Sequence, residues 1–124
     1  MALIPKFINV ASTHKEGETF VWACEGFPIP AFIASVSMIL KIAAATKDPA
    51  NQISIFFEQL TATGWATVGT VGGLAGDYEA AVSPITQQLI PTMNIGMSGS
   101  NGLDSYRWRV LSVKPFTFTL LNDI

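Results

Sequence analysis

The chain has 124 residues, of which 49% are hydrophobic and 13% are charged, and its formal net charge is −2. A chain of this length is expected to form a single domain, residues 1–124, that buries a core without disulfides. Its charged share is about half the usual one. The acidic balance argues against a nucleic-acid partner, which would normally require a basic patch.

The low charge has two possible explanations. One is a β-protein surface rich in Thr and Ser, and the other is a large interface between subunits. Cys24 is the only cysteine, so no intrachain disulfide can form. The first residues lack the apolar run of a signal peptide, and no Asn-x-Ser/Thr acceptor occurs. These features predict a cytoplasmic protein, with a component of a secreted or viral particle as the alternative.

The first part of the chain is predicted to contain two strands separated by a polar turn. Residues 6–11 form the first strand, residues 12–17 the turn and residues 18–25 the second strand. The second strand is rich in β-branched and aromatic residues, and apolar side chains would occupy both of its faces, as expected for a central strand. The residues on one of these faces are Phe20, Trp22 and Cys24.

The most apolar stretch, residues 27–45, has three possible structures. A membrane helix needs about 20 apolar residues, but Pro28, Pro30 and Lys41 interrupt this stretch. A buried helix is compatible with its Ala, Met and Leu content. At a period of two, however, the polar residues all fall on odd positions. We therefore predict a long strand whose even-numbered side chains form the apolar face: Ala34, Val36, Met38, Leu40, Ile42 and Ala44.

Residues 52–60 and 65–70 are predicted to form a hairpin with a Thr-Gly connection. Residues 71–76, VGGLAG, are predicted to be flexible. At most one short helix is expected, near residues 84–90, because a Ser-Pro pair begins this segment and a proline ends it.

Three further strands are predicted in the last third of the chain, at residues 92–98, 105–113 and 116–120. An Asn-Gly turn separates the first two. With about eight short strands and regular turn signals, the predicted fold is all-β, an antiparallel sandwich or flattened barrel.

The layout along the chain resembles that of small uncharacterised bacterial immunoglobulin-like sandwich proteins. The resemblance rests on a strand that ends in Gly-Phe-Pro, a long apolar strand, a strand that ends in Thr-Gly and a late Tyr-x-Trp strand. These features cover about two thirds of the chain. The resemblance implies a β-sandwich, and it implies no activity.

No motif in the sequence predicts an enzyme, a metal centre or a cofactor. His14, Glu16 and Glu18 are best explained as a solvated turn, because metal sites recruit ligands from converging positions. The glycines of residues 69–76 match no phosphate-binding motif. Cys24 shares its predicted face with aromatic residues, which predicts an unreactive thiol.

Arg107 and Arg109, which flank Trp108, are the most informative pair in the sequence. Arginines two apart on a strand point the same way, about 7 Å apart. They could bind an anion, stack on an aromatic ring, or pair with Glu58 or Glu79 across the sheet. A cross-strand ion pair or a subunit contact is the simpler explanation.

The predicted function is therefore a non-enzymatic binding or assembly module that forms a homo-oligomer, without a nucleic-acid or membrane partner. The alternative is a β-barrel or sandwich whose cavity binds a small apolar ligand. In that case Trp22, Trp65 and Trp108 are the candidate wall residues.

Overall fold

The computed structural model describes residues 8–29, 35–78, 92–94 and 104–123. Most of these residues lie in strands, joined in one place by the 3-10 helix η1 (Ala44–Thr46). The strands are β1 (Ile8–Ser12), β2 (His14–Glu16), β3 (Thr19–Ala23), β4 (Phe27–Pro28), β5 (Ser35–Ile42), β6 (Asp48–Thr61), β7 (Gly64–Gly76), β8 (Thr92–Asn94), β9 (Ser105–Ser112) and β10 (Thr117–Asp123).

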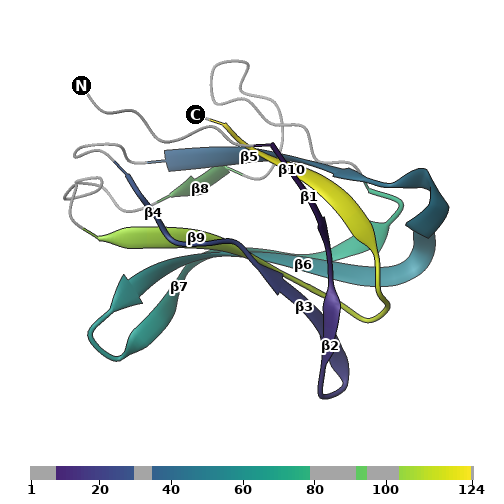
Figure 1. Ribbon diagram of the computed structural model, residues 1–124, viewed down its shortest axis with the longest axis horizontal. Coiled ribbons are helices and arrows are strands. Elements are labelled where there is room, and N and C mark those ends of the chain that lie inside the picture. Colours follow the sequence, from purple (N-terminus) through teal and green to yellow (C-terminus); the bar gives the residue numbers. More distant parts are fainter. Residues whose placement is uncertain (1–7, 30–34, 79–91, 95–103, 124) are drawn as a thin grey trace.

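The strands form two antiparallel sheets that lie one above the other (Figure 1). The first sheet has the order β1-β10-β5-β8, and the second has the order β2-β3-β9-β6-β7 with β4 also paired to β9. The chain passes repeatedly from one sheet to the other, as it does in double-sheet jelly rolls. The predicted all-β antiparallel sandwich is confirmed, and of the two predicted forms the described strands adopt the sandwich rather than the closed barrel.

This order differs from that of an immunoglobulin constant domain, where consecutive strands are neighbours in both sheets. In the first sheet here, no two consecutive strands pair with each other.

The core lies between the two sheets and receives side chains from both. Tyr106, Trp108 and Val110 point inward from β9, and each is no more than 1% exposed. Phe118 and Leu120 point inward from β10 and are equally buried. The remaining buried members of the core are Phe27, Ile29, Met38, Leu40, Ile42, Ile53, Ile55, Phe57 and Phe116.

The apolar stretch is extended, as predicted, over β4 and β5. β5 pairs with β10, with Leu40 opposite Leu120. Met38, Leu40 and Ile42 are buried, whereas Lys41 is exposed. The period-two alternation of this segment therefore places one row of side chains in the core and the other on the outer face.

Ala44, predicted on the apolar face of the same strand, is instead exposed in η1, because the chain turns there before β6 begins at Asp48. Residues 30–34, with Ala34, lie outside the described residues.

A bulge separates β3 from β4, so the strand predicted over residues 18–25 ends at Ala23. Ala23 pairs with Arg109 and Phe27 pairs with Tyr106, so three residues on one strand oppose two on the other. Cys24 lies in this bulge and keeps the two strands together, because its N–H donates to the Trp108 carbonyl at 3.0 Å. The extra residue bends the chain and changes its direction at the end of the sheet.

Two segments predicted as turn or flexible loop are strands. Residues 12–17 contain β2, which forms a tight hairpin with β3 because Gly17 adopts a positive φ of 61°. Residues 71–76 belong to β7, which pairs with β6 as far as Gly76 opposite Asp48. Pairing with a long neighbouring strand overrides the weak strand propensity of glycine.

Other predictions lie outside the described residues. These are the short helix near 84–90, the part of the predicted strand at 95–98 and the Asn-Gly turn at 101–102.

Candidate functional site

The two arginines of β9 lie on the outer face of the second sheet. Tyr106, Trp108 and Val110 are buried on the inner face, so the alternation along β9 turns Arg107 and Arg109 outward. The side chains of the two arginines are 23% and 33% exposed. The sequence prediction that they share a face is therefore confirmed.

Glu58 lies between the arginines on the neighbouring strand. β6 pairs with β9 in a register that sets Glu58 opposite Arg107. The Arg107 Nε donates to Glu58 Oε1 at 2.8 Å, and the Arg109 Nη1 lies 3.8 Å from Glu58 Oε2. Although Glu58 is on an outer face, its side chain is only 6% exposed, because the two arginines lie over it.

Two aromatic rings complete this group. The guanidinium carbon of Arg107 lies 4.3 Å from the centre of the Trp65 ring, and that of Arg109 lies 5.6 Å from the centre of the Phe56 ring. Both distances are within the range of cation–π attraction. We call the five residues the outer-face cluster: Phe56, Glu58, Trp65, Arg107 and Arg109.

The outer-face cluster is pre-organised. The Glu58 carboxylate pairs with both guanidinium groups, and each guanidinium also lies over an aromatic ring, Trp65 for Arg107 and Phe56 for Arg109. The arginine side chains therefore have little conformational freedom left to lose when a partner binds. One carboxylate opposes two guanidinium groups, which leaves the cluster with a net charge of +1. Trp and Arg are the residue types that contribute most at protein interfaces. The arrangement can therefore hold a partner's apolar and acceptor groups side by side.

The other two candidate tryptophans do not join this cluster. Trp108 is fully buried in the core. Trp22 packs edge-on against Phe118 of the opposite sheet, with ring centres 5.1 Å apart. Trp22 and Trp108 thus lie on the inner side of the second sheet and Trp65 on its outer side. The three rings do not line one cavity, as the alternative of an apolar-ligand site would require.

Cys24, which the sequence predicts to be unreactive, is a neutral thiol. Burial raises its pKa to about 11, and the backbone N–H of Trp108 donates to its Sγ at 3.2 Å. A raised pKa opposes the thiolate that nucleophilic chemistry requires. His14 lies on β2 with an exposed side chain 4.0 Å from the Glu16 carboxylate, a surface pair rather than part of a site.

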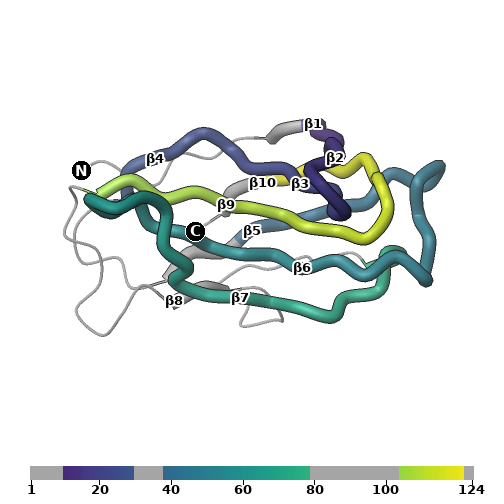
Figure 2. Tube along the Cα trace, turned by 90° about the horizontal axis from the view of Figure 1, so that it is seen from below, coloured from purple at the N-terminus to yellow at the C-terminus, as the bar shows by residue number. Residues whose placement is uncertain are grey.

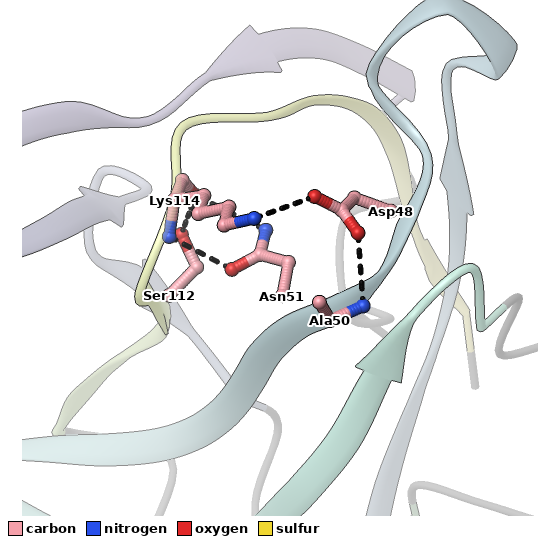
Figure 3. Close-up of polar contacts among 5 residues, drawn as sticks. All are labelled: Asp48, Ala50, Asn51, Ser112 and Lys114. Atoms are coloured by element: carbon pink, nitrogen blue, oxygen red, sulfur yellow. Dashed lines mark hydrogen bonds and ion pairs between the residues drawn. The ribbon is translucent and has the colours of Figure 1, made fainter.

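A second polar group ties the start of β6 to the turn between β9 and β10 (Figure 3). Asn51 donates to the Lys114 carbonyl at 3.1 Å and accepts from the Lys114 N–H at 2.8 Å. The Ser112 hydroxyl donates to the same carbonyl at 2.6 Å. Asn51 is 1% exposed. Both the nitrogen and the oxygen of the Asn51 amide are hydrogen-bonded to the Lys114 backbone. The amide therefore secures the turn rather than binding a ligand.

The exposed rim of this group is an ion pair. Lys114 Nζ donates to Asp48 Oδ2 at 2.9 Å, and the N–H of Ala50 donates to Asp48 Oδ1 at 2.9 Å. These two hydrogen bonds, that from Lys114 above all, lower the pKa of the Asp48 carboxyl. Asp48 is thus fixed by Ala50 on its own strand and by Lys114 in the turn between β9 and β10.

Of the outer-face cluster, sequence reasoning identified Arg107, Arg109 and Trp65 as site candidates and named Glu58 as a possible partner. Phe56 was missed. Its signal is the alternation of β6, in which Ile53, Ile55 and Phe57 point inward and the residues between them must point outward with Glu58. Glu79, the other partner considered, lies outside the described residues.

Comparisons with known proteins found no matching family model, no matching curated protein and no matching solved structure. The resemblance to bacterial immunoglobulin-like proteins therefore stays a prediction from the sequence. Within the described residues, no group of three His, Cys, Asp or Glu side chains could hold a metal ion. None of the helical structure found there is long and apolar enough to cross a membrane.

Proposed function

We propose that the protein is a non-enzymatic binding or assembly module that works as a homo-oligomer, with the outer face of its second sheet as the contact surface. Jelly-roll sandwiches occur in capsid, lectin and enzyme-like proteins, so the fold alone favours none of these roles. The proposal rests instead on the composition and geometry of this one face.

The observation that carries the proposal is the outer-face cluster itself. A partly exposed tryptophan and two partly exposed arginines lie beside a buried carboxylate that pairs with both arginines. Aromatic and arginine side chains of this kind supply most of the binding free energy at protein interfaces. They contribute more when they are already ordered before the partner binds. The low overall charge of the chain, 13% of residues, fits a surface that a second copy covers.

Light scattering coupled to size-exclusion chromatography tests the proposal across micromolar concentrations. We expect a mass at least twice the 13.3 kDa of one chain. Trp65→Ala should shift the equilibrium toward the monomer, because it removes the ring on which Arg107 stacks. The matched control is Val113→Ala, which trims a side chain that is 57% exposed and lies in the turn after β9. A monomer at every concentration would exclude self-assembly.

A further inference from the structure

The sheet edges differ sharply in length. Among the described strands, β1 and β8 end the first sheet with 5 and 3 residues, and β2 ends one side of the second sheet with 3. β7 ends the other side with 13 residues. Figure 2 shows β7 along the margin of this sheet, next to β6. It therefore presents the longest row of backbone N–H and C=O groups that no described strand pairs.

The sequence of β7 lacks charge and proline, two of the features that usually protect an edge. Natural edge strands are protected from pairing with other chains by being short or by carrying charged side chains, proline or bulges. β2 is short and has the sequence HKE, whereas β7 is GWATVGTVGGLAG, without charge or proline. β7 does have bulges relative to β6, one at Val68 and one at Gly72–Gly73. They lie on either side of Thr70 and leave the pairing regular between them.

Self-pairing of β7 would centre on Thr70. When a strand pairs antiparallel with its own copy over its whole length, its middle residue faces itself, and the middle of Gly64–Gly76 is Thr70. A Thr–Thr pair across strands is favourable. Between the two bulges of β7, the other pair is Gly69 with Val71, which sets a larger side chain opposite a glycine.

We propose that two copies of this chain associate through β7, antiparallel about a twofold axis near Thr70, so that their second sheets join into one continuous sheet. The absence of charge in β7 means that no residue meets a like charge across the axis. Trp65 of the outer-face cluster lies on β7 itself, so the cluster borders this contact. The inference rests on the proposed homo-oligomer and extends its contact surface from the outer face to the neighbouring β7 edge.

Charge exchange at Thr70 tests the pairing directly. Thr70 is exposed, so Thr70→Lys and Thr70→Glu should each fold, which circular dichroism and thermal melting of the separate variants verify. Each variant alone places like charges opposite each other and should weaken association by about tenfold. An equimolar mixture of the two variants places opposite charges together and should restore the dimer. The matched control is Ala62→Lys, an exposed change at the β6–β7 turn that should leave the dimer intact.

The possible results separate this inference from the proposed function. Dissociation of both variants with rescue by mixing supports pairing through β7. Dimers that persist in both variants, or variants that dissociate without rescue, overturn pairing through β7 and leave the homo-oligomer to another surface. A wild-type chain that is monomeric at every concentration overturns both proposals.

Discussion

Glu58 holds the outer-face cluster together at the scale of single residues. Its carboxylate is almost completely covered by two side chains that are themselves partly exposed. An ion pair in this setting is screened less by water than one on an open surface, and removing one partner leaves the other without its hydrogen bond. The strength of the pair can be compared with that of an exposed pair in the same molecule.

A double-mutant cycle on Glu58→Gln and Arg107→Gln measures this pair. We expect a coupling free energy of about 1 kcal/mol or more from urea unfolding. The same cycle on the exposed pair of Asp48 and Lys114 serves as the control and should give a smaller coupling, because water competes for both groups. Equal couplings for the two pairs would mean that burial does not strengthen the contact of Glu58.

The Cys24 thiol is predicted to react slowly in the folded protein. Its pKa is raised from 9.0 to about 11, so at pH 8 the thiolate fraction should be about 100-fold lower than in the unfolded chain. Labelling with a thiol reagent, with and without denaturant, measures this ratio. Equal rates in the two conditions would contradict burial of the thiol.

The same shift predicts a dependence of stability on pH. Because the folded pKa of Cys24 lies above the unfolded value, its contribution is fully present below pH 9 and is lost as the pH rises through about 11. Cys24→Ala should remove this part of the alkaline loss of stability, measured by urea unfolding between these pH values.

At the scale of elements, β5 has one face in the core and one outside. Leu40 is 1% exposed, and its neighbour Lys41 is exposed. We expect Leu40→Ala to lower the free energy of unfolding by about 2–5 kcal/mol. Lys41→Gln should change it by no more than about 0.5 kcal/mol. Chemical denaturation measures the free energy of unfolding of both variants. Similar decreases for the two would show that the two faces of β5 do not differ in burial.

The whole molecule depends on contacts between distant parts of the chain. β10 lies between β1 and β5 in the first sheet, and Ser12 pairs with Thr117, 105 residues further along. Phe116, Phe118 and Leu120 contribute buried side chains from this last segment. Removing β10 would take away a strand from the middle of the sheet and part of the core.

We therefore expect a chain that ends at Pro115 to remain unfolded, with no dispersed amide signals in its NMR spectrum. The control is the full chain with a short Gly-Ser insertion between Ala62 and Thr63, in the exposed turn between β6 and β7. This chain should fold, because local turns tolerate insertion whereas a lost central strand cannot be replaced. A folded truncated chain would show that the first sheet does not require β10.

The period-two alternation in the sequence was sufficient to predict β5 and β9 and the faces of their side chains. It predicted that β5 is extended with Leu40 on its apolar face, and that Arg107 and Arg109 point the same way. Each of these follows from local geometry, since alternate side chains of a strand leave on opposite sides whatever the strand pairs with.

Which strands are neighbours was decided by the tertiary structure. Glu58 and Arg107 are 49 residues apart, and they meet only because β6 packs beside β9 in one particular register. Residues 71–76 have the composition of a flexible loop, yet they are strand because β6 continues beside them. The edge position of β7 is likewise a property of the sheet order. The free energy that selects this order comes from closing one shared core between two sheets, and no local pattern in the sequence carries that information.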